Sequence, residues 1–209
     1  MAEKWVEIDT KNFCELETKY NNKKYPEDVY ERIILSVKHD KQLSVQSLRE
    51  AIFWKYGKWQ QFSKSKGCPP SLVKVINKMV QNLMEMNELF RSNIERDYKI
   101  EKMRQKLDQI LGNGIVTKAW ILHIYFPGFC RVIDQHTFRA MRYLSLGTFP
   151  NDPLKLKWIN IPPRTWEDVR EYERFFAKFK THHSMTDRSL DKCLMAWGKD
   201  LKNRHKSEK

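Results

Sequence analysis

Apolar residues recur along most of the chain at the three- and four-residue spacing that places side chains on one face of an α-helix. The clearest stripe predicts one helix across residues 72–90, and its members are Leu72, Val75, Ile76, Met79, Val80, Leu83, Met84 and Phe90. Similar stripes predict helices at residues 29–37, 48–59, 94–111, 166–179 and 190–201. The sequence has no alternating apolar and polar run bounded by Asn-Gly or Asp-Gly turns. We therefore expect an all-α protein of about seven to nine helices.

Capping residues and helix breakers divide these stripes. Ser44 or Ser47 is a candidate cap for the 48–59 stripe, and Thr165 with Asp168 forms a capping-box pattern ahead of the 166–179 stripe. Glycine and proline clusters mark breaks at residues 67–70, 112–114, 127–128, 149–153 and 161–163. We interpret these breaks as turns within a single domain spanning residues 1–209. Its tail, residues 199–209, has a net charge of +3 and is expected to fray.

The composition narrows the class of partner. The chain has 209 residues, of which 41% are hydrophobic, and this is enough to build a packed core. Its 39 Lys and Arg residues against 26 Asp and Glu give a net charge of +13, which favours nucleic acid or an acidic membrane face. The densest apolar stretch, residues 119–126, is much shorter than the roughly 20 residues of a membrane span. We expect a core helix there and no membrane partner.

The cysteines and the N-terminus bear on cofactors and location. Four cysteines, at positions 14, 68, 130 and 193, include no CxxC pair, which argues against a zinc site, an iron–sulfur cluster and a disulfide scaffold. We therefore expect no cofactor and no metal. The first residues lack a basic region followed by an apolar segment, so we expect an intracellular protein, in the cytoplasm or nucleoid or in the nucleus.

Residues 106–144 carry the most information. One helix is expected to end at a Gly-x-Gly turn, from which a second, strongly apolar helix starts, giving a helix-hairpin-helix pattern. Glycines allow positive φ and a close approach to a ligand, and the N–H groups of a helix start can bind a phosphate. The candidate DNA-binding residues are Gly112, Asn113, Gly114, Ile115, Val116 and Thr117. The turn alone is equally compatible with two glycines that only end one helix and begin the next.

The continuation after the second helix favours the DNA-binding interpretation. Pro127-Gly128 is followed by the run Asp134-Gln135-His136-Thr137-Phe138-Arg139. With the hairpin, this run resembles the signature of the helix-hairpin-helix/GPD superfamily of DNA glycosylases, closest to its endonuclease III and adenine glycosylase branch. Without a gap, the matching positions are Gly112, Gly114, Thr117, Leu122, Phe126, Asp134, His136 and Arg139. The resemblance covers about forty residues and implies a two-lobed helical fold with an interlobe cleft.

The resemblance also implies an activity and a partner. Such enzymes act in base excision repair or modified-base removal, and they flip a damaged, mismatched or modified base out of double-stranded DNA. Asp134 would be the catalytic carboxylate that assists hydrolysis of the N-glycosidic bond, because the sugar develops positive charge in the transition state. Asp134 is also a normal N-cap residue, and the two roles are compatible. We expect the chain to act as a monomer.

The register decides whether the enzyme also cleaves the strand. Bifunctional members have a lysine in the hairpin that attacks the sugar and gives AP lyase activity. The ungapped alignment places Val116 there and suggests a monofunctional, water-using enzyme. Sliding the hairpin by two residues would make Lys118 the nucleophile instead, so Lys118 stays a candidate catalytic residue. Its alternative role is a snorkelling or phosphate-contacting lysine. The cluster cysteines of many relatives are missing.

Other residues carry weaker signals. Aromatic residues and lysines alternate in residues 53–59, and most of these rings are expected in the core. His182 and His183 are expected in an exposed loop rather than at a metal. His136 is expected to support Asp134 or to pack near the hairpin, and Arg139 to form a salt bridge within the fold. The competing functions are a noncatalytic helix-hairpin-helix DNA-binding protein and, less favoured, an RNA-binding or membrane-surface adaptor.

Overall fold

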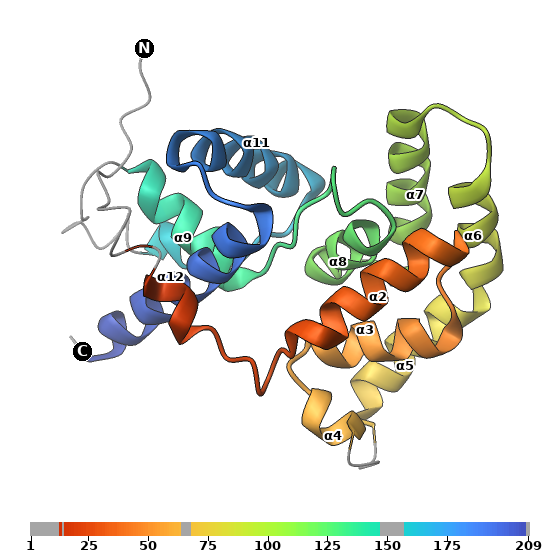
Figure 1. Ribbon diagram of the computed structural model, residues 1–209, viewed down its shortest axis with the longest axis horizontal. Helices are drawn as coiled ribbons and strands as arrows, with labels where there is room; N and C mark the ends of the chain where they lie inside the picture. Colours follow the sequence, from red (N-terminus) through yellow and green to blue (C-terminus); the bar gives the residue numbers. More distant parts are fainter. Residues whose placement is uncertain (1–12, 14, 64–67, 147–156, 208–209) are drawn as a thin grey trace. The chain divides into compact units, whose positions relative to one another are not determined.

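The computed structural model describes residue 13 and residues 15–63, 68–146 and 157–207, and every regular element in these ranges is a helix (Figure 1). The expected all-α class is therefore confirmed. The chain divides into two compact units. We call residues 21–131 the inserted unit, and residues 1–20 with 132–209 the discontinuous unit. Each unit has its own core and is described separately.

The inserted unit contains seven helices within its described residues. They are α2 (Glu27–Asp40), α3 (Val45–Lys55), α4 (Trp59–Ser63), α5 (Pro70–Gln81), α6 (Leu83–Arg91), α7 (Arg96–Leu111) and α8 (Ile115–Tyr125). Nearly every residue of α8 is buried, as expected for a helix that is apolar on all sides. Helices α2, α3 and α7 pack against it. The expected core helix at residues 119–126 is thus confirmed.

The single helix expected across residues 72–90 is wrong, because α5 and α6 are separate helices that meet at Asn82. The Asn82 backbone leaves the helical region with φ −111° and ψ 4°, and its side-chain amide donates to the Lys78 carbonyl at 2.9 Å. Asparagine interrupts helices in this way because its side chain competes for backbone acceptors. The apolar stripe continues through the break, so periodicity alone does not reveal it.

A buried asparagine joins three parts of the inserted unit. Asn87 on α6 accepts hydrogen bonds through Oδ1 from the Leu43 N–H and the Tyr125 hydroxyl, both at 2.8 Å. Its Nδ2 donates to the Leu43 carbonyl at 3.0 Å. Burial raises the pKa of Tyr125, so its hydroxyl stays protonated and can donate. This amide fixes the loop after α2 and the end of α8 against α6.

The discontinuous unit is built from η1 (Leu16–Lys19), α9 (Gln135–Ser145), α11 (Trp166–His183) and α12 (Asp187–Ser207). The capping box of Thr165 and Asp168 at the start of α11 is confirmed. His182 and His183 occupy the last turn of α11, so the expected loop is wrong there. Helix α12 extends into the expected tail and ends at Ser207. The break expected at 149–153 lies outside the described residues.

Helices α9 and α12 pack against each other (Figure 1). A glycine of α12, Gly198, lies against the backbone of α9. A β-carbon on Gly198 would lie 1.9 Å from the carbonyl oxygen of His136 and 2.6 Å from its carbonyl carbon. Only a residue without a side chain allows the two backbones this close. Gly198 therefore fixes the distance between α12 and the first turn of α9. In the part of the chain that the structure describes, no helix is both long and apolar enough to cross a membrane.

Candidate functional site

The hairpin turn lies between α7 and α8 in the inserted unit. Helix α7 ends at Gly112, which has φ 58° and ψ −119° and whose N–H donates to the Asp108 carbonyl at 3.1 Å. Gly114 is the N-cap of α8. A side chain is strained at the Gly112 conformation, so the first glycine is required by the backbone. The expected helix, glycine turn and apolar helix are all present.

The start of α8 leaves part of its backbone available. The N–H groups of Thr117 and Lys118 both donate to the Gly114 carbonyl at 3.0 Å. The N–H groups of Gly114 and Val116 donate to no backbone carbonyl of the described residues. Such N–H groups at a helix start can bind an anion, and the helix dipole adds to the attraction.

Lys118 lies away from the hairpin surface. Its side chain is 8% exposed, and its Nζ is 2.5 Å from Oδ1 of Asp108 on α7. Val116, at the position where bifunctional members of the resembled family have lysine, is half-buried. A nucleophilic amine must be unprotonated and reach the sugar. In this structure the buried Lys118 side chain ties α8 to α7 through its ion pair with Asp108.

Asp134 is the N-cap of α9 in the discontinuous unit, as its sequence context predicts. Its Oδ1 accepts hydrogen bonds from the N–H groups of His136 and Thr137 at 2.6 and 2.9 Å. The Thr137 hydroxyl accepts from the Asp134 N–H at 2.9 Å and completes a capping box. The carboxylate is half-buried and points in a fixed direction at the positive end of α9. It can stabilise a positive charge that develops next to it.

Arg139 sets the tautomer of the histidine in this motif. Its Nη1 donates to Nδ1 of His136 at 3.1 Å and to the Gly198 carbonyl at 2.9 Å, and its Nε donates to Oδ1 of Asn160 at 2.7 Å. These three acceptors are neutral. Burial lowers the pKa of Arg139, and the charge of the nearby Asp134 carboxylate opposes that shift. Because a guanidinium only donates, Nδ1 of His136 accepts, and the neutral ring has its proton on Nε2.

The neutral form of His136 is also favoured by its surroundings. Burial is the main cause that lowers the pKa of His136 below its ordinary value. The nearby Asp134 carboxylate opposes this shift, whereas Arg139, Lys199 and Lys202 add to it. The expectation that His136 supports Asp134 agrees with the hydrogen bond from its backbone. His136 therefore offers a neutral ring beside the carboxylate.

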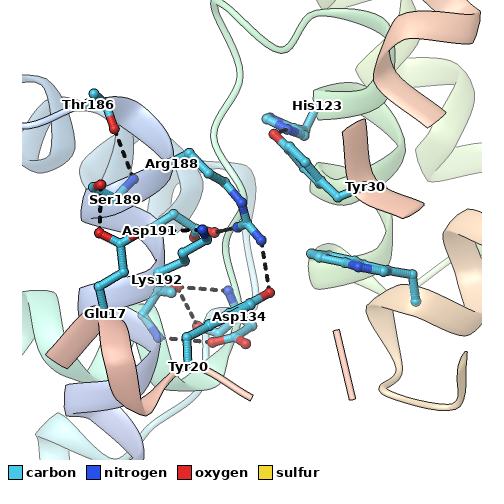
Figure 2. Close-up of polar contacts among 12 residues, drawn as sticks. Glu17, Tyr20, Tyr30, His123, Asp134, Thr186, Arg188, Ser189, Asp191 and Lys192 are labelled. Atoms are coloured by element: carbon cyan, nitrogen blue, oxygen red, sulfur yellow. Dashed lines mark hydrogen bonds and ion pairs between the residues drawn. The ribbon is translucent and has the colours of Figure 1, made fainter. Parts of the chain in front are cut away.

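A polar network that the sequence did not indicate joins α12 to η1 (Figure 2). The Ser189 hydroxyl donates to Glu17 Oε2 at 2.7 Å. Arg188 pairs with Asp191 and donates to the Tyr20 hydroxyl at 2.9 Å. Opposite charges meet in this network, so we assign it the structural role of holding the N-terminal segment on α12.

A second missed cluster lies in the inserted unit around Tyr30 and His123 (Figure 2). Nδ1 of His123 lies 2.7 Å from the Cys130 carbonyl, which only accepts, so Nδ1 has the proton. In the neutral ring Nε2 then accepts from the Tyr30 hydroxyl at 2.8 Å. The Trp120 ring stacks on His123, with centroids 5.6 Å apart, and also on Trp54, with centroids 4.9 Å apart. The helical spacing of apolar residues predicts that these rings are buried, but it does not indicate the hydrogen bonds that they form.

The aromatic segment 53–59 divides as its spacing predicts. Phe53 and Trp54 are buried in the core. Tyr56 is 42% exposed, and its hydroxyl shares a 2.7 Å hydrogen bond with Oγ1 of Thr117 on the first turn of α8. The end of α3 is thus fastened to the hairpin helix.

The candidate residues fall into two groups. The residues of the hairpin turn belong to the inserted unit, and Asp134, His136 and Arg139 belong to the discontinuous unit. Among the residues that the structure describes, no group of three His, Cys, Asp or Glu side chains could hold a metal ion. No protein-family model, curated protein or solved structure matches the chain.

Proposed function

We propose that the chain is a DNA glycosylase that flips an altered base out of a duplex and hydrolyses its N-glycosidic bond. The observation that supports the proposal is the glycine hairpin between α7 and α8, followed by Asp134 at the N-cap of α9. These are the two features that the resemblance leads us to expect. The charge distribution supports it, because the inserted unit contains 20 of the 39 basic residues and only 11 of the 26 acidic ones. This excess attracts a polyanion to the unit that carries the hairpin.

In the proposed reaction, the bond between C1′ of the sugar and the base nitrogen breaks, and the base leaves with the bonding electrons. Positive charge then develops on the sugar, and the fixed Asp134 carboxylate stabilises it. Water adds to C1′, Asp134 can accept its proton, and the departing base anion takes up one proton, so that one water molecule is consumed overall. The products are the free base and an abasic site.

We prefer the monofunctional mechanism, in which water attacks the sugar, over the bifunctional mechanism, in which a lysine attacks it and the strand is cleaved. Lys118 is buried and ion-paired with Asp108, and Val116 has no amine to attack the sugar. A purified chain that yields strand breaks only after alkali treatment, with no protein–DNA adduct trapped by borohydride, would agree with this. An adduct that disappears in Lys118→Ala would establish the bifunctional mechanism instead.

The test of the proposal is Asp134→Asn, assayed on end-labelled duplexes that contain a panel of damaged, mismatched and modified bases. Asparagine caps a helix as well as aspartate does, so the variant keeps the hydrogen bonds to α9 and removes only the negative charge. We expect excision to fall by at least about 100-fold, with duplex affinity almost unchanged. Asp168→Asn, at the capping box of α11, is the matched control and should excise at the parental rate.

Two outcomes would reject the proposal. Equal excision by Asp134→Asn and the parent would remove Asp134 from the chemistry. Salt-sensitive duplex binding without any released base across the panel would favour the noncatalytic helix-hairpin-helix protein.

A further inference from the structure

The side chain of Lys24 lies against the turn that ends α3. Gly57 has φ 61°, and a β-carbon on it would lie 2.2 Å from Cε of Lys24, so the Lys24 side chain runs across this turn. Lys58 follows Gly57 directly. Lys24 and Lys58 are exposed, and within the described residues neither forms an ion pair. We call these two lysines, with Tyr56 and Gly57, the α3-turn patch.

The patch adjoins the hairpin. The hydroxyl of Tyr56 shares a hydrogen bond of 2.7 Å with Oγ1 of Thr117, three residues after the hairpin glycine Gly114. Nζ of Lys55, the last residue of α3, lies 5.8 Å from the centroid of the Trp120 ring on α8. Both contacts lie within the inserted unit, so the patch and the hairpin turn are on neighbouring parts of one body.

The sequence around the patch is positive over a long distance. Between Glu50 and Glu85 the chain has six lysines and no acidic residue. Within this stretch Lys58 therefore has no acidic neighbour along the chain. Exposed lysines in the same unit as the hairpin N–H groups suit a partner with regularly repeated anions, such as the phosphodiester backbone of nucleic acid.

We propose that the α3-turn patch binds backbone phosphates next to those bound by the hairpin, through the Lys24 and Lys58 ammonium groups. The inserted unit then contacts the duplex at two neighbouring points, and the Tyr56–Thr117 hydrogen bond fixes their spacing. This inference rests on the proposed function and adds a second DNA contact to it. An acidic protein partner is the competing occupant.

The test compares two pairs of substitutions that remove equal charge. Lys24→Gln with Lys58→Gln changes the patch, and Lys74→Gln with Lys78→Gln changes two exposed lysines of α5 in the same unit. Binding to a fluorescent duplex is measured between about 50 and 200 mM salt, and each lost phosphate contact lowers the slope of log K against log salt by about 0.9. We expect the patch variant to lose nearly two units of slope and the α5 variant less than half a unit. Circular dichroism checks that both variants are folded.

Val116→Glu separates this inference from the proposed function. It places a negative charge at the hairpin turn and is expected to weaken duplex binding on its own. If Val116→Glu weakens binding while the patch and α5 pairs behave alike, the hairpin contact stands and the patch is not a phosphate site. If the parent shows no salt-sensitive duplex binding, both proposals fall.

Discussion

The contact between Gly198 and the backbone of His136 allows a direct test of how α9 and α12 are packed. Replacing Gly198 with Ala adds one methyl group inside α12. From helix propensity alone, the change should stabilise the protein by about 1 kcal/mol, because Ala is a better helix former than Gly. The packing against α9 predicts the opposite sign. The experiment therefore separates the two effects by direction and not only by size.

The magnitude follows from the distance. The new β-carbon would lie 1.9 Å from the His136 oxygen, and both opposed groups are backbone, so no side-chain rotation relieves the clash. The helices must separate by about 1 Å, which loosens their packed interface. Overpacking a buried site costs about 1–3 kcal/mol, and we place this substitution at the upper end. After the gain in propensity, the free energy of unfolding should fall by about 2 kcal/mol.

The assay is urea unfolding followed by circular dichroism and tryptophan fluorescence. Gly128→Ala is the control, because a β-carbon there meets nothing within 4 Å. It should leave the free energy of unfolding almost unchanged. If Gly198→Ala is as stable as the parent or more stable, then the close approach of α12 to α9 is not a property of the folded protein.

Three further predictions concern other positions. Gly112→Ala should lower the free energy of unfolding by about 1–3 kcal/mol through backbone strain alone, because its β-carbon would meet no other atom within 4 Å. Urea unfolding measures this effect, and Gly128→Ala is the control without a positive φ. Asn87→Ala leaves the buried Leu43 groups without partners and should lower the free energy of unfolding by about 2–4 kcal/mol in the same assay. Burial lowers the pKa of His136, so the unfolded chain binds a proton more readily than the folded one. Stability should therefore fall as the pH drops below 6.5, and thermal melts of His136→Asn should show a flatter dependence there.

The sequence predicts the helices better than their ends. The distribution of apolar residues predicts α7 and α8, and the glycines between them predict the turn. Residues other than glycine rarely adopt a positive φ. The break at Asn82 is hidden because the apolar stripe passes through it in phase. Its cause is a local side-chain hydrogen bond, which hydrophobic periodicity does not report.

The candidate site is predictable only where a motif marks it. Asp134 and the hairpin residues follow from their fixed separation. The burial of Lys118 cannot be predicted in this way, because its ion-pair partner Asp108 lies ten residues earlier on another helix. The neutral state of His136 also depends on Arg139 and on a helix from the far end of the chain. Contacts between segments that are distant in the sequence decide these properties. Such contacts cannot be inferred from a single sequence before the fold is known.

The insertion of residues 21–131 between the two parts of the discontinuous unit has a consequence for the order of folding. The inserted unit can form from contacts within one continuous segment. The hydrogen bond between Glu17 and Ser189 joins residues 172 positions apart. The segment that contains η1 therefore cannot form this contact until α12 has been synthesised. Closing a long loop is slow because its entropy cost precedes any favourable contact. We expect the inserted unit to fold first during synthesis and the discontinuous unit, with the Asp134 cap, to complete its core last.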